Sequence, residues 1–111
     1  MARLPMSERA ILDIRKIEDY CLDPWHPRGR HKARLFRELL GVTRKDAAWL
    51  RGVLLAGVQD AEAGEIAVDV FGRRWRVDVP ISRQDMSVVV RTIWIVRTGE
   101  EVPRFVTCWV L

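Results

Sequence analysis

Residues 26–32 bring together side chains that can bind an anion and transfer a proton. The segment holds two histidines and three cations, in the order His26, Arg28, Arg30, His31 and Lys32. Imidazole titrates close to neutral pH, so a histidine can act as a general acid or base. Arginine and lysine donate charge-assisted hydrogen bonds to phosphate oxygens. This combination of residue types predicts that the segment faces an anionic partner.

The helix that follows this segment strengthens the prediction. Apolar residues at helical spacing and a glycine stop predict a helix over residues 30–40: Ala33, Phe36, Leu39, Leu40 and Gly41. A helix start carries about half a positive charge, so cations there cost roughly a few tenths of a kcal/mol each unless an anion joins them. Free backbone amides at the same end add donors to a bound phosphate. A phosphate site is the simplest physical explanation.

Two residues of the segment are the main candidates for catalysis. Lys32 begins the apolar stripe, so it either lines a pocket or lays its aliphatic stem along apolar surface. His26 lies in a constrained loop between Trp25 and Pro27, where it either transfers a proton or donates a hydrogen bond to a backbone carbonyl. The candidate contacts to nucleic acid are Arg28, Arg30, His31 and Arg34.

A second group of candidates lies in the C-terminal half, where Arg91, Thr92 and Thr107 interrupt apolar segments. In a strand, neighbouring side chains point to opposite faces, so one pocket cannot use both Arg91 and Thr92 unless a bulge intervenes. An arginine between apolar neighbours needs a carboxylate or a ligand anion. Asp69 or Asp78 supplies the structural alternative.

Hydrophobic periodicity predicts the N-terminal elements that position these residues. Residues 13–21 are predicted to form a short helix capped by Asp13, after an irregular segment over residues 1–12. Thr43 and Asp46 resemble a capping box that opens a further helix. The first half of the chain is therefore predicted to be helical.

After Gly64 the apolar period changes from helical to alternating, which is typical of strands. Four strands are predicted, over residues 66–70, 75–79, 87–97 and 105–111. Gly72 and Arg73 are predicted to form the first hairpin turn. The last two strands are apolar on both faces, so we expect them at the centre of the sheet or against a covered face. The fold class is α+β, with N-terminal helices packed on a C-terminal four-stranded antiparallel sheet.

Composition narrows the classes of protein that fit. A length of 111 residues suits one domain, residues 1–111, and no segment has the uncharged apolar length of a membrane span. We therefore expect a cytoplasmic protein without membrane contact, in which Cys21 and Cys108 are buried packing residues. No glycine-rich nucleotide loop or metal-ligand spacing is present, so neither a metal nor another cofactor is expected. A net charge of +4 is compatible with a nucleic-acid partner.

Several short motifs lie along the chain from residue 26 onward: His26-Pro-x-Gly29-x-x-Lys32-Ala33-x-x-Phe36, Phe71-Gly72, Arg91-Thr92-x-Trp94, and the ending from Pro103 through Leu111. Together they resemble an uncharacterised bacterial domain family found in toxin–antitoxin and phage-associated settings. The resemblance implies a toxin-like protein with a small acidic antitoxin-like partner. The order of elements also resembles the metal-independent ribonuclease class of barnase, EndoU, the colicin ribonucleases and RelE.

That second resemblance implies an endoribonuclease that cleaves RNA by general acid/base catalysis. In it, His26 and Lys32 would match basic helix residues, and Arg91, Thr92 and Thr107 would match polar positions on the sheet. The alternative function is a non-catalytic module that binds nucleic acid or a partner protein. Its support is the succession of two helices around Gly41, although the second helix has few cations for a recognition helix. Neither the RNA substrate nor the oligomeric state follows from the sequence.

Overall fold

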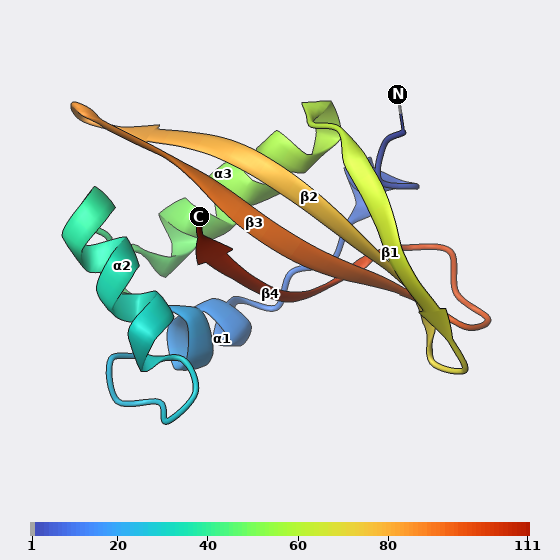
Figure 1. The fold of residues 1–111 in the computed structure, drawn as a ribbon, viewed down its shortest axis with the longest axis horizontal. Coiled ribbons are helices and arrows are strands. Elements are labelled where there is room, and N and C mark those ends of the chain that lie inside the picture. The colour runs from blue at the N-terminus through green and yellow to red at the C-terminus, as the bar shows by residue number, and fades with distance from the viewer. Residues whose placement is uncertain (1) are drawn as a thin grey trace.

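Helices occupy the first half of the chain and an antiparallel sheet occupies the second (Figure 1). The computed structural model describes residues 2–111. The helical elements are η1 (Ser7–Arg9), α1 (Ile14–Lys16), the π-helical turn η2 (Ile17–Cys21), α2 (Arg30–Leu40), the 3-10 turn η3 (Arg44–Asp46) and α3 (Ala47–Asp60). The strands are β1 (Ala63–Asp69), β2 (Gly72–Arg83), β3 (Met86–Arg97) and β4 (Arg104–Val110). The predicted α+β fold class is confirmed.

Local sequence signals account for where the helices begin and end. The Asp13 carboxylate accepts a hydrogen bond of 3.0 Å from the Arg15 backbone N–H and so caps α1. Thr43 and Asp46 form the predicted capping box before α3. Gly41 ends α2 with φ of +63°, a conformation that glycine adopts without steric cost. These predictions from sequence are confirmed.

The four strands pair in sequence order, β1-β2-β3-β4, as an antiparallel meander. The first hairpin turn lies at Val70 and Phe71, not at the predicted Gly72 and Arg73, because Gly72 already pairs with Asp69 across the hairpin. Asp69 accounts for the difference, since its carboxylate accepts a hydrogen bond of 2.8 Å from the Phe71 N–H and starts the turn two residues earlier. Of the two apolar strands, β3 is internal and β4 is an edge strand.

The helices are arranged unequally around the sheet. Figure 1 shows α3 behind the long β2–β3 ribbon and α2 beside β4, while the β1–β2 turn extends beyond the helices. The apolar side of α3 joins the inward side chains of the sheet in one core, which includes Leu50, Leu54, Val58, Val77, Val79, Trp94 and Phe105. Within residues 2–111, no helix has the length and apolar character to cross a membrane.

The contact between α3 and β2 is close enough to require a glycine. A Cβ atom at Gly57 would overlap Val79 Cγ1, whereas a Cβ at Gly52 would meet no atom within 4 Å. Val79 is buried and β-branched, so its side chain has little freedom to turn away. The packing distance of the helical layer on the sheet therefore depends on Gly57.

Gly57→Ala should therefore lower the free energy of unfolding by about 1–3 kcal/mol, because the added methyl overfills the interface. Gly52→Ala is the matched control in the same helix and should raise it by about 0.5–1 kcal/mol, since alanine is the better helix former. Urea denaturation of both variants measures the difference. Equal effects at the two positions would contradict the close approach.

Candidate functional site

The Lys32 ammonium lies where the start of α2 meets the edge strand β4. Its Nζ donates to Thr107 Oγ1 at 3.0 Å and to Tyr20 Oη at 3.4 Å. It also lies over two aromatic rings, 4.9 Å from the Tyr20 centroid and 5.2 Å from the Trp109 centroid. Three elements, η2, α2 and β4, therefore meet at one cation. The sequence-based prediction that Lys32 turns inward is confirmed.

The Lys32 ammonium has no carboxylate partner in the part of the chain that the structure describes. Among residues 2–111, Lys32 takes part in none of the ion pairs within 4.0 Å. Two of its three N–H donors meet neutral oxygens, so one donor is left for a ligand. A pocket of about 350 Å³ opens at Lys32 and Trp109, and its wall also includes His31, Leu35 and Val110. The charge is therefore available to an anion that enters this pocket.

The loop before α2 folds back onto Tyr20. A Cβ atom at Gly29 would overlap the Tyr20 carbonyl oxygen, so this close approach requires glycine. The His26 ring lies against the Tyr20 ring, with centroids 4.7 Å apart and planes inclined by 53°. His26 and Lys32 thus share the Tyr20 ring as a common neighbour. The structure brings together Lys32, His26 and Thr107 among the predicted catalytic residues.

Hydrogen bonds restrict what His26 can do. Its Nδ1 accepts the backbone N–H groups of Arg28 at 3.0 Å and of Gly29 at 3.1 Å. This is the reverse of the predicted structural alternative, in which the imidazole donated to a backbone carbonyl. With the Nδ1 lone pair engaged, the neutral ring carries its proton on Nε2. His26 is therefore arranged as a hydrogen-bond donor through Nε2.

Two buried thiols lie behind Thr107. Cys21 and Cys108 are both free and buried, and Cys21 Sγ is 3.9 Å from Thr107 Oγ1. A hydrogen bond from Cys108, with further contributions from Thr107 and the Lys32 charge, lowers the pKa of Cys21 to about 7 against the opposing effect of burial. The hydrogen bond to Cys21 and burial raise the pKa of Cys108. The positive charge of Lys32 thus contributes to the lowered pKa of a buried thiol.

Arg91 and Thr92 lie on opposite faces of β3, as predicted, and Arg91 is the β3 partner of Trp109 on the face that carries Thr107. The Arg91 guanidinium makes two hydrogen bonds to the Asp78 carboxylate, at 2.9 and 3.0 Å, and lowers the pKa of Asp78. Thr92 is fully buried, donates to the Val77 carbonyl at 2.6 Å and accepts from Trp94 Nε1 at 2.8 Å. Both side chains have structural partners: Arg91 lies next to Trp109 but is engaged by Asp78, and Thr92 lies in the core.

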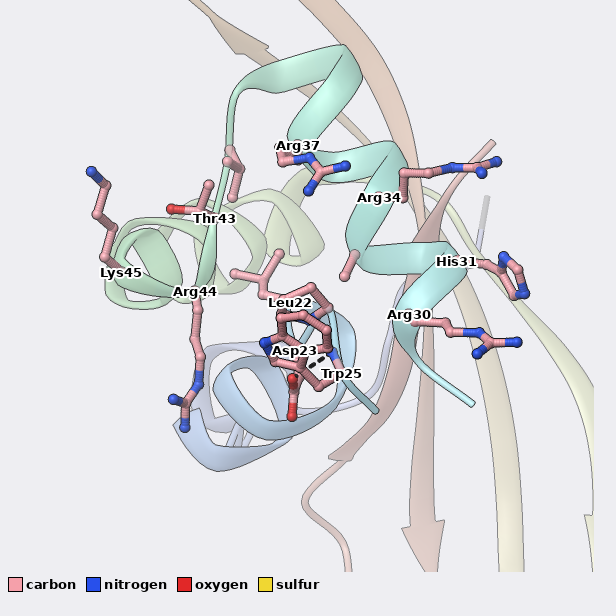
Figure 2. Close-up of a pocket in the computed structure, with 13 residues that line it drawn as sticks. Leu22, Asp23, Trp25, Arg30, His31, Arg34, Arg37, Thr43, Arg44 and Lys45 are labelled. Atoms are coloured by element: carbon pink, nitrogen blue, oxygen red, sulfur yellow. Dashed lines mark hydrogen bonds between the residues drawn. The ribbon is translucent and has the colours of Figure 1, made fainter. Parts of the chain in front are cut away.

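The predicted nucleic-acid contacts surround the start of α2. Arg28, Arg30, His31 and Arg34 are all exposed. Arg30, His31 and Arg34 line a groove of about 560 Å³ between α2, the loop at residues 22–25 and residues 42–45 (Figure 2). His31 borders both this groove and the smaller pocket at Lys32. The two cavities therefore lie on either side of the first turn of α2.

The predicted catalytic residues did not include two members of the site, Tyr20 and Trp109. The sequence does indicate Trp109, because it lies two residues after Thr107 and the two side chains must share one face of a strand. Tyr20 had no comparable signal, because only the fold of the loop onto η2 brings it to Lys32. Among residues 2–111, no three His, Cys, Asp or Glu side chains gather in a group that could hold a metal ion.

Thr92→Val tests the structural role of the buried hydroxyl. Losing that hydroxyl leaves the Trp94 indole N–H without an acceptor, so the free energy of unfolding should fall by about 1–3 kcal/mol. Thr92→Ser keeps the hydroxyl and loses only a methyl group, which should cost about 1 kcal/mol. Urea denaturation compares the two variants. A valine variant more stable than the serine variant would contradict the importance of the hydrogen bond.

Residues 3–111 match the family model described as Domain of unknown function (DUF6883). Searches of curated proteins and of solved structures found no significant match. The matched residues include every helix and strand of the fold, together with Tyr20, His26, Lys32 and Thr107. The chain therefore belongs to the family described as Domain of unknown function (DUF6883).

Proposed function

We propose that this protein is a metal-independent ribonuclease whose active site is centred on Lys32. One observation carries the proposal: a partly buried ammonium at the mouth of a pocket, held by hydroxyls and aromatic rings with no carboxylate to neutralise it. Such a cation is suited to the negative charge that develops on a phosphoryl group. The surrounding exposed cations, Arg28, Arg30 and Arg34, suit a polyanionic substrate.

In the proposed reaction, the RNA supplies its own nucleophile. The 2′-oxygen forms a bond to phosphorus, the bond from phosphorus to the 5′-oxygen breaks, and the products are a 2′,3′-cyclic phosphate and a 5′-hydroxyl. Lys32 stabilises the charge on the non-bridging oxygens, and His26 donates to the same oxygens through Nε2. Thr107 is a positioning residue, because it holds the ammonium at 3.0 Å.

The reaction also requires that a proton leave the 2′-hydroxyl and that one reach the 5′-oxygen. We assign both movements to the Tyr20 hydroxyl, which lies 3.4 Å from Lys32 Nζ: its oxygen takes up the 2′-proton as its own proton passes to the 5′-oxygen, so the hydroxyl is restored at the end of the step. His26 was the residue predicted for this role. Its Nδ1 would have to release two backbone amides before it could take up a proton, so it is the weaker candidate.

An anion should stabilise the folded protein through Lys32. Phosphate at ten times its dissociation constant should add about 1.4 kcal/mol and raise the thermal midpoint by several degrees. Lys32→Met keeps the aliphatic volume but should abolish most of the shift, whereas Arg97→Met should keep it. Arg97 lies six residues beyond Arg91, the β3 partner of Trp109, which is about 20 Å along the strand. Equal phosphate shifts in the two variants would place the anion elsewhere.

Cleavage of RNA by the purified protein in EDTA tests the proposed activity. Single-stranded RNA should be cut to products that end in a cyclic phosphate, and DNA should survive because it lacks the 2′-hydroxyl. Lys32→Met and Tyr20→Phe should each lower the rate by about a hundredfold or more, with Arg97→Met as the control. His26→Gln should weaken the reaction less than Tyr20→Phe.

Two outcomes would redirect the proposal. A larger loss in His26→Gln than in Tyr20→Phe would return the proton transfer to the imidazole. If wild-type protein binds RNA through Lys32 and leaves it intact, the ribonuclease assignment is wrong and the non-catalytic binding module is favoured.

A further inference from the structure

Trp25 is the exposed tryptophan of this protein. Its side chain is 87% exposed, whereas Trp94 is fully buried and Trp49, Trp75 and Trp109 are partly buried. Its loop is held in place, because the Asp23 carboxylate accepts the Trp25 backbone N–H at 2.9 Å. Pro24 and Pro27 restrict the same loop further. A large aromatic face is therefore held in solvent, where it contributes little to the core.

The groove beside Trp25 is strongly basic. Figure 2 shows the indole at one end of a groove whose α2 wall carries arginines spaced by three and four residues, so that they share one side of the helix. The lining cations are Arg30, Arg34, Arg37, Arg44 and Lys45, and the lining carboxylate is Asp23, which already accepts the loop hydrogen bond.

Most of these cations keep their charge for a ligand. Among residues 2–111, no carboxylate lies within 4.0 Å of Arg30, Arg37 or Lys45, and the Arg34 pair with Glu38 is long at 3.8 Å. Arg44 is the exception, since it pairs with Asp19 at 2.6 Å. The groove therefore combines a free aromatic face with a row of largely uncompensated positive charges.

We infer that this groove binds a single-stranded segment of RNA, with one base stacked on Trp25 and the phosphates along the cations of α2. The identity of the strand as substrate rests on the proposed ribonuclease function. An unpaired base exposes its face for stacking, whereas a duplex keeps its base faces covered by neighbouring pairs. The acidic side chains of a peptide would match the cations equally well, but they carry no ring that could stack on the indole.

The position of the groove fits a substrate of the Lys32 site. His31 borders both cavities, so a strand that passes over the first turn of α2 would lead from Trp25 to Lys32. Nucleotides in the groove would then fix the strand relative to the scissile phosphate. The inferred specificity is for unpaired RNA, with stacking on Trp25 that tolerates any base.

Binding can be measured without cleavage by using a fluorescein-labelled 2′-O-methyl oligouridylate of about eight nucleotides, which lacks the nucleophilic hydroxyl. Fluorescence anisotropy should show that Trp25→Ala weakens binding about tenfold or more, while Trp25→Phe keeps most of the affinity. Annealing the oligonucleotide to its complement should weaken binding to the wild-type protein. The double variant Arg30→Ala, Arg37→Ala should lower by about 1.4 the slope of the logarithm of the binding constant against the logarithm of the salt concentration. The control variant Arg97→Ala should leave this slope unchanged.

The inference is overturned if Trp25→Ala binds the oligonucleotide as tightly as wild type, or if the duplex binds as tightly as the single strand. Polyglutamate offers charge but no ring, so it should displace the oligonucleotide from Trp25→Ala at a lower concentration than from the wild-type protein. Displacement at the same concentration from both proteins would also overturn the inference. These results are separable from those on catalysis. If binding depends on Trp25 but natural RNA is not cleaved, the ribonuclease function is wrong and RNA binding in the groove stands. If cleavage depends on Lys32 and Trp25→Ala has unchanged kinetics, only RNA binding in the groove is wrong.

Discussion

The hydrogen bond between Lys32 and Thr107 joins the helical half of the chain to the sheet across 75 residues of sequence. Its geometry depends on where α2 lies against β4, since a small displacement of the helix would separate the ammonium from the hydroxyl. Tyr20 and Trp109 surround the same ammonium, so η2 must also pack against the helix start. The proposed site therefore exists only in the assembled fold.

Periodicity and capping signals were sufficient to predict the elements and part of the site. The apolar stripe of α2 predicted that Lys32 turns inward, because helical spacing alone determines which face carries a residue. The period of two in β3 similarly separated Arg91 from Thr92. These predictions depend on local geometry, which neighbouring residues in the sequence determine.

Contacts between distant elements were not predictable in the same way. Asp69 and Asp78 were equivalent partners for Arg91 in the sequence, and only the register of β2 with β3 sets Asp78 opposite Arg91. The contact of Tyr20 with Lys32 and the groove beside Trp25 likewise arise from loop packing. The first hairpin turn was misplaced because the side chain of Asp69, rather than a glycine, determines where it begins.

The distribution of ion pairs decides which surface can attract a polyanion. On the sheet, Arg74 pairs with Asp69, Arg91 with Asp78 and Arg104 with Glu100. These pairs cancel much of the charge that the strands contribute, although the sheet carries several arginines. Along α2, Arg30 and Lys32 in the first turn and Arg37 in the last turn have no such partners within the described part of the chain. Helix α2 therefore presents several unpaired cations close together, which is the arrangement that the proposed polyanionic ligand requires.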